Sequence, residues 1–188
     1  MVQTTIQHDI LTFLVENSDN SFSIKEISEH IDKDYKNTFD AVKQMPSINI
    51  SKVGSSNQVS FNFEFSTLLF EVETDRKKRL LKDKNIKTIC ADLSKLDSQF
   101  ILLLFGSRAK KKHRKNSDYD LLLLSDNPDK VERKVGLYPI NIDLNVFSLD
   151  EFRQMLLSKE FTVISEAVKH NVILFGIEDY YRLIKNAK

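Results

Sequence analysis

The sequence of 188 residues predicts an α+β protein built from two small domains. Apolar residues recur at helical spacing through most of the chain, whereas three apolar runs between residues 100 and 147 have the length or alternation of strands. The charge also changes sign. Residues 1–65 hold five Lys and nine Asp or Glu, a net charge of −4, and residues 66–188 hold 23 basic and 18 acidic residues, a net charge of +5. We therefore predict a domain over 1–65, a linking helix over 66–84 and a second domain over 85–188.

The N-terminal domain is expected to contain three helices followed by a hairpin. Helical spacing and strand alternation of the apolar residues place these elements at 6–14, 24–31, 35–44, 48–50 and 59–63. Ser23 and Glu26 have the spacing of a capping box, which predicts the start of the second helix. This order of elements resembles a winged helix-turn-helix.

The resemblance to a winged helix-turn-helix leaves two roles open for this domain. Such folds usually bind DNA through a basic recognition helix. The third helix offers Lys36, Asn37 and Lys43 to a duplex, but Asp34 and Asp40 oppose contact with phosphate. DNA binding and a role in protein interaction or dimerisation are therefore both retained.

The second domain is expected to contain a sheet flanked by helices. Apolar stripes predict helices from Thr67 onwards and over 86–96, and strands at Phe100–Phe105, Tyr119–Leu124 and Pro139–Phe147. Ser148 and Glu151 form a second capping box, which predicts another helix. The remaining residues, 161–188, are expected to form two helices separated by the apolar run Val172–Phe175.

The segment from Phe105 to Leu124 contains the candidate catalytic and metal-binding residues. Successive side chains of a strand point to opposite faces, so Asp118 and Asp120 are expected to project from one side while Tyr119 packs on the other. Two adjacent carboxylates repel each other unless a cation lies between them. Mg²⁺ is the natural candidate, because it prefers oxygen ligands and is usually held by one or two carboxylates together with substrate phosphates.

Further residues complete the predicted site. Asp143 lies on the polar face of the third strand, where it is placed to supply a third carboxylate. Gly106 and Ser107 stand at a strand end before a loop, where close backbone approach and a hydroxyl donor suit phosphate. Arg108 is the best single candidate for another phosphate contact, because its planar guanidinium matches phosphate oxygens.

The spacing of these residues is similar to a known signature. A Gly-Ser pair followed after ten residues by Asp-Tyr-Asp (residues 106–120) resembles the polymerase-beta-like nucleotidyltransferases, particularly the minimal nucleotidyltransferases. The resemblance covers roughly residues 85–188, and Asp143 matches the third acid of the family. It implies a small mixed sheet flanked by helices and leaves the first 65 residues unexplained.

The resemblance also implies a role for each residue. Asp118 and Asp120 would bind the metal that holds the nucleotide phosphates, and Gly106 and Ser107 would grip the triphosphate. Asp143 would bind a second metal and help to activate an attacking hydroxyl, so that pyrophosphate leaves as the nucleotide is transferred.

The reaction implied is a Mg²⁺-dependent transfer of a nucleoside monophosphate, AMP from ATP or the equivalent from another NTP, to a hydroxyl of a protein or other acceptor. The resemblance further suggests the antitoxin of a HEPN and minimal nucleotidyltransferase toxin-antitoxin pair, which adds AMP to a tyrosine of its HEPN-type partner. The alternative is a transcription regulator that senses nucleotide and binds DNA with little or no turnover.

A basic run follows the Gly-Ser pair and departs from the family pattern. Lys110–Lys112 stand where members of the family often have a second glycine. The whole run, Lys110–Lys115, is either a solvated loop or a surface that attracts a nucleotide, RNA or an acidic partner.

The sequence also constrains the surroundings of the protein. The N-terminus lacks the basic start and apolar run of a signal peptide, and no segment reaches the length of a membrane span, so we expect a cytoplasmic protein with no membrane contact. The single cysteine, Cys90, lies among apolar residues at helical spacing and is expected to be a buried structural thiol.

Overall fold

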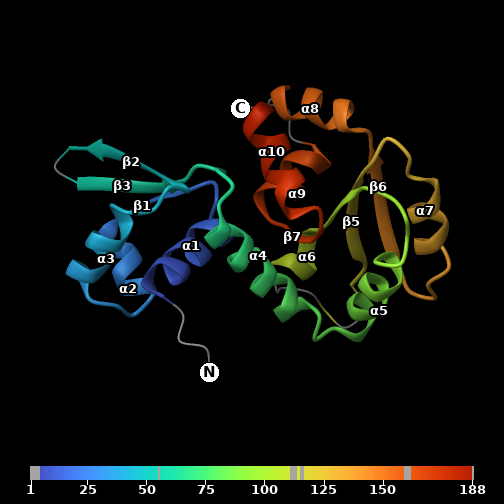
Figure 1. Cartoon of the computed structure of the whole chain (residues 1–188), viewed down its shortest axis with the longest axis horizontal. Helices are drawn as coiled ribbons and strands as arrows, with labels where there is room; N and C mark the ends of the chain where they lie inside the picture. Colours follow the sequence, from blue (N-terminus) through green and yellow to red (C-terminus); the bar gives the residue numbers. More distant parts are fainter. Residues whose placement is uncertain (1–4, 55, 111–113, 115–116, 159–161, 188) are drawn as a thin grey trace. The chain divides into compact units, whose positions relative to one another are not determined.

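The computed structural model describes residues 5–54, 56–110, 114, 117–158 and 162–187 (Figure 1). The chain is α+β, as predicted, and divides into two compact units, Met1–Val72 and Glu73–Lys188. Each unit has its own sheet. Helix α4 (Thr67–Leu80) begins in the first unit and ends in the second.

The first unit contains three helices and a three-stranded antiparallel sheet. The helices are α1 (Ile6–Glu16), α2 (Ile24–His30) and α3 (Tyr35–Val42), and the strands β1 (Ser21–Ser23), β2 (Ile48–Val53) and β3 (Ser56–Phe61) pair in the order β1-β3-β2. The predicted capping box is confirmed, because Ser23 Oγ accepts a hydrogen bond from Glu26 N at 3.2 Å and the Glu26 carboxylate accepts one from Ser23 N at 2.7 Å.

Two details of this unit were not predicted. Strand β1 has three residues, too few to show alternation, and exists through its pairing with β3. The hairpin also ends earlier than expected, since β3 stops at Phe61 and Phe63 has a φ of 59°, in the left-handed region that is incompatible with a strand.

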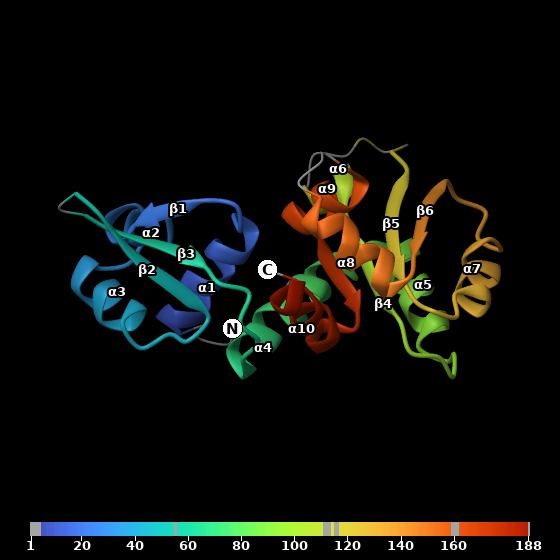
Figure 2. The same cartoon turned by 90° about the horizontal axis from the view of Figure 1, so that it is seen from above.

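The second unit is built on a four-stranded mixed sheet with strand order β6-β5-β4-β7. The strands are β4 (Ile101–Leu104), β5 (Tyr119–Leu124), β6 (Ile142–Phe147) and β7 (Val172–Phe175). Strands β5 and β6 run parallel, whereas β4 is antiparallel to both β5 and β7. Helices α5 (Lys84–Leu93), α6 (Gly106–Ala109), α7 (Asp129–Val135), α8 (Leu149–Leu157), α9 (Val163–Lys169) and α10 (Ile177–Ala187) complete the unit (Figure 2).

Alternate residues of the central strands form the main core of this unit. The side chains Leu102, Leu104, Tyr119, Leu121 and Leu123 pack with buried residues of α5 and α7. Tyr119 therefore packs away from the neighbouring aspartates, as the strand alternation predicted. Cys90 belongs to the same core, and its burial agrees with a structural thiol.

The tail of the chain differs from the sequence prediction. The apolar run Val172–Phe175 is not a spacer between helices but the edge strand β7, which pairs with β4. Periodicity does not separate a short apolar run in a strand from one in a helix or loop, so the pairing partner decides. Helix α7 was not predicted, and β6 begins at Ile142 rather than at Pro139.

Candidate active site

The predicted phosphate and metal residues meet where β4 ends and β5 begins. Because these strands are antiparallel, the residues that follow β4 lie beside the first residues of β5. Phe105 N donates to Asp120 O at 2.9 Å and continues the ladder by one bond. Gly106 and Ser107, the first residues of α6, are thereby placed next to Asp120.

Gly106 and Asp120 are in close contact. A Cβ atom at Gly106 would lie 2.0 Å from Oδ2 of Asp120, and the φ of Gly106 is +67°. Glycine is therefore required here both by its backbone conformation and by the carboxylate that occupies the space of a side chain. The backbone N–H of Ser107 lies beside the same carboxylate.

Asp143 comes to the same place from the neighbouring strand. It is the register partner of Asp120 in the parallel pair of β5 and β6, and register partners in adjacent strands point to the same face of a sheet. Asp118 directly precedes β5 and is exposed, as is Asp143, whereas Asp120 is half-buried. Three carboxylates thus gather at one end of the strands, on the side opposite Tyr119.

The electrostatics of this cluster are unfavourable without a counter-charge. Burial raises the pKa of Asp120 above its ordinary value, and nearby carboxylates raise it further. In decreasing order of effect they belong to Asp143, Asp118 and Glu166. The hydrogen bond from Ser107 N–H opposes this rise in the pKa of Asp120. A bound cation would remove most of the repulsion.

The donor set fits a divalent metal that shares its coordination with a ligand. The cluster consists of hard carboxylate oxygens, which Mg²⁺ prefers. Among the residues that the structure describes, no three acidic, His or Cys side chains are arranged to hold one ion by themselves. The arrangement therefore suits an ion held by one or two carboxylates plus phosphate oxygens, and not a preformed protein cage.

Glu166 is a fourth carboxylate at this place that the sequence analysis did not identify. It lies on α9, and Lys110 Nζ forms an ion pair with its Oε1 at 3.0 Å. This contact joins residues 56 positions apart in the sequence. No local pattern around Glu166 indicates it, so a search of the sequence for paired acids does not find it.

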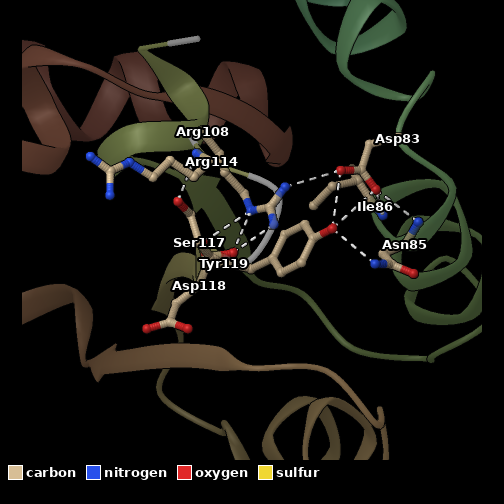
Figure 3. A network of polar contacts seen from close by, with 8 residues as sticks. All are labelled: Asp83, Asn85, Ile86, Arg108, Arg114, Ser117, Asp118 and Tyr119. Carbon is tan, nitrogen blue, oxygen red and sulfur yellow. Dashed lines mark hydrogen bonds and ion pairs between the residues drawn. The ribbon is translucent and has the colours of Figure 1, made fainter. Parts of the chain in front are cut away.

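Arg108 lies in a different environment from the one predicted for it. Its side chain is buried, and its donors face Ser117 O, Asp118 O and Asp83 Oδ2 (Figure 3). None of these acceptors is a carboxylate oxygen of the cluster. The guanidinium also lies over the ring of Tyr119, 3.6 Å from its centroid. A phosphate contact by Arg108 stays a prediction, and it would require these contacts to be given up.

Two further sequence predictions concern the basic run and membrane contact. Within the basic run, Lys111, Lys112, His113 and Lys115 lie outside the described residues. In the described part of the chain, no helix is both long and apolar enough to cross a membrane.

Comparison with known proteins identifies the domain that holds this cluster. The family model "Polymerase beta, Nucleotidyltransferase" matches residues 84–180. No curated protein and no solved structure matches the chain. The matched region contains β4, α6, β5 and β6, and with them the Gly-Ser pair and the three aspartates. Since the match covers more than half of the 188 residues, the chain belongs to the polymerase beta nucleotidyltransferase family.

Proposed function

We propose that this protein is a Mg²⁺-dependent nucleotidyltransferase that transfers AMP from ATP to a hydroxyl group. The observation that carries the proposal is the Asp120 carboxylate, which is enclosed by Gly106 and the Ser107 N–H and lies beside Asp118 and Asp143. A half-buried carboxylate surrounded by like charges is costly for folding, so its presence favours a functional role.

In this proposal the aspartates bind metal and Ser107 contacts phosphate. Asp118 and Asp120 would hold one Mg²⁺ together with the nucleotide phosphates, and Asp143 would hold a second. When bound, these ions supply charge neutralisation at the reacting phosphate. Ser107, at the start of α6, would contact phosphate through its hydroxyl.

The transfer requires the acceptor hydroxyl and the nucleotide to be held in line, and it needs no covalent intermediate with the protein. The acceptor oxygen attacks the alpha-phosphorus, the bond from that phosphorus to the departing pyrophosphate breaks, and the hydroxyl proton leaves to a base. Asp143 is exposed, so it is accessible to an incoming acceptor and is our candidate for orienting its hydroxyl and taking its proton.

We extend the proposal to the acceptor, on the strength of the resemblance to the minimal nucleotidyltransferases. The acceptor would be a tyrosine hydroxyl of a HEPN-type ribonuclease, which the added AMP silences. Incubation with the HEPN-type product of an adjacent gene and ATP should add AMP to one tyrosine, detected as a mass increase of the corresponding peptide. Unmodified peptide at full ATP consumption would instead indicate a small-molecule or RNA acceptor.

Labelled ATP tests the chemistry. The wild-type protein with Mg²⁺ and candidate acceptors should give labelled product, and the double variant Asp118→Asn and Asp120→Asn should give none. Asp150→Asn is a matched control, because it removes an exposed carboxylate of α8 outside the cluster. Equal labelling by the double variant would contradict the proposal, and so would equal losses in the double and control variants.

A second candidate function is DNA binding by the first unit. It is supported by α3, which presents exposed Tyr35, Lys36 and Asn37 and is followed by the hairpin of β2 and β3. Asp34 caps α3 by accepting from Asn37 N at 3.1 Å, so this acid has a structural role besides opposing phosphate. Gel-shift experiments with the protein's own promoter at several salt concentrations should show specific retardation if the unit binds an operator, and none at low salt if it does not.

A further inference from the structure

We propose that Arg108 and Asp83 are positioning residues that fix the backbone of Asp118 for metal binding. This inference rests on the proposed function and concerns two residues that would not touch the substrate. Asp118 lies outside β5, which begins at Tyr119. The sheet ladder reaches only the N–H of the next residue, because Tyr119 N donates to Asn141 O at 3.0 Å, and the Asp118 carbonyl oxygen is left to accept from a side chain.

Arg108 forms hydrogen bonds to the backbone just before β5. Its Nε donates to Ser117 O at 3.1 Å and to Asp118 O at 3.0 Å, and its Nη2 donates to Ser117 O at 2.6 Å. These bonds join the two ends of the segment between α6 and β5. The Asp118 carboxylate points away from the guanidinium (Figure 3), so Arg108 holds the backbone and leaves the acidic group to a ligand.

Asp83 anchors the guanidinium from the other side. Its Oδ2 lies 3.3 Å from Arg108 Nη1, while its Oδ1 accepts from Asn85 N at 2.9 Å and from Ile86 N at 3.3 Å as the cap of α5. One carboxylate thus ties Arg108 to the start of a core helix.

Tyr119 completes the anchor. Its hydroxyl donates to Asp83 and accepts from Asn85 Nδ2 at 2.9 Å, and Arg108 lies over its ring. The guanidinium is therefore held on its edge by Asp83 and on its face by an aromatic ring.

The geometry of the guanidinium explains why arginine is needed here. A planar fork reaches two carbonyl oxygens and a carboxylate at once, whereas the ammonium of lysine is a compact point charge without that fork. Loss of the fork would remove the side-chain donors to the carbonyl oxygens of Ser117 and Asp118. Mutation of a residue that orients a metal ligand without touching the metal commonly lowers metal affinity or activity by about 10-fold to 100-fold.

Binding of Mn²⁺ with ATP, followed by calorimetry and by the Mn²⁺ paramagnetic resonance signal, tests this role without requiring turnover. Arg108→Lys keeps the charge and loses the fork. Asp83→Asn keeps a good helix cap and loses the charge. Both variants should bind Mn²⁺ about 10-fold to 100-fold more weakly than the wild type in the presence of ATP. Their kcat/KM for ATP, measured at a fixed Mn²⁺ concentration, should fall by a similar factor, because metal and nucleotide bind together.

Tyr181→Phe is the matched control for stability. Tyr181 donates to Glu73 in the same unit but outside the carboxylate cluster, so this variant should lower the unfolding midpoint while Mn²⁺ affinity stays at the wild-type value. Unchanged Mn²⁺ affinity in both Arg108→Lys and Asp83→Asn would overturn the positioning role alone.

The remaining outcomes separate this inference from its alternatives. Weaker ATP binding without metal in Arg108→Lys, together with an unaffected Asp83→Asn, would make Arg108 a phosphate ligand and overturn the positioning role. Failure of the wild-type protein to bind Mn²⁺ with ATP at all would overturn the proposed function, and the positioning role with it.

Discussion

Gly106 and Asp120 share a space that has room for one side chain. A Cβ atom at Gly106 would lie 2.0 Å from Asp120 Oδ2 and 2.7 Å from Asp120 Cγ. The glycine of the Gly-Ser pair is therefore needed by the neighbouring strand as well as by any phosphate that approaches its backbone. This contact makes the conformation of α6 and the direction of the Asp120 carboxylate dependent on each other.

Gly106→Ala should consequently remove activity. The left-handed φ costs about 1–3 kcal/mol for a residue other than glycine, and the new Cβ displaces the Asp120 carboxylate. We expect nucleotidyl transfer to fall by at least about 100-fold, as a 1 Å misplacement in an active site can cost that factor. Gly176→Ala is the control, because Gly176 also has a positive φ but its Cβ would meet Ile101. That variant should lose stability and keep its activity per folded molecule; equal activity losses in both variants would show that strain alone is responsible.

Asp120→Asn should stabilise the protein in the absence of metal. The pKa of Asp120 is higher in the folded than in the unfolded protein, so stability is lost as the pH rises from the ordinary carboxyl pKa through the folded pKa. Asn carries no charge and avoids this loss, which we expect to add roughly 0.5–2 kcal/mol to the free energy of unfolding at pH 7. Thermal unfolding without metal measures the gain.

The gain from Asp120→Asn should depend on pH and on cations. It should shrink as the pH falls toward the ordinary carboxyl pKa, where Asp120 is protonated in both states. Mg²⁺ should also reduce it, because the cation stabilises the wild-type cluster. Asp150→Asn removes an exposed carboxylate and should change stability by less than about 0.5 kcal/mol. A gain independent of pH would argue against charge repulsion as its cause.

Two ion pairs with the same spacing on α4 should contribute very differently to stability. Arg76 and Glu73 are buried and three residues apart, and Arg76 also donates to Asn171 O at 2.5 Å. Lys78 and Asp75 have the same separation but are largely exposed. Arg76→Met removes the only positive charge paired with Glu73 in the described residues, although the Tyr181 hydroxyl still donates to it, and should cost about 3–5 kcal/mol. Lys78→Met should cost less than about 1 kcal/mol.

Urea unfolding of the two α4 variants provides the comparison. The free energies of unfolding should be measured under identical conditions, with the far-ultraviolet circular dichroism of each variant as a check on folding. Similar losses in both variants would contradict a special role for burial. A large loss confined to Arg76→Met would show that the network of α4 with the C-terminal part of the chain stabilises the second unit.

Cys90 should react slowly with thiol reagents in the folded protein. The thiol is buried in the core formed with α5 and the sheet, and burial raises its pKa. Both effects reduce the accessible thiolate, the species that reacts. Labelling at pH 8 should be roughly 100-fold slower than in urea, because it requires local opening of the core. Equal rates under both conditions would mean that α5 does not pack as described.

The sequence by itself determined the helices and strands whose pattern is local. Apolar spacing predicted α1, α2 and α5, and both capping boxes are present. Strand β5 has the predicted limits, Tyr119–Leu124, which include the alternation of Tyr119 with Asp120 and the leucines that follow. The spacing from the Gly-Ser pair to Asp118 and Asp120 likewise indicated a family that the comparison then showed. Such signals are contained within a few residues and do not depend on the rest of the fold.

Only the tertiary structure decided which distant residues meet. Strand β7 became part of the sheet through its pairing with β4, although its four apolar residues have no distinguishing period. Arg108 turned toward Asp83 and the carbonyl oxygens before β5, and Glu166 reached the carboxylate cluster from α9. The physical reason is the same in each case. A short apolar run or a charged side chain has several favourable partners, and the contacts formed across the fold select one of them.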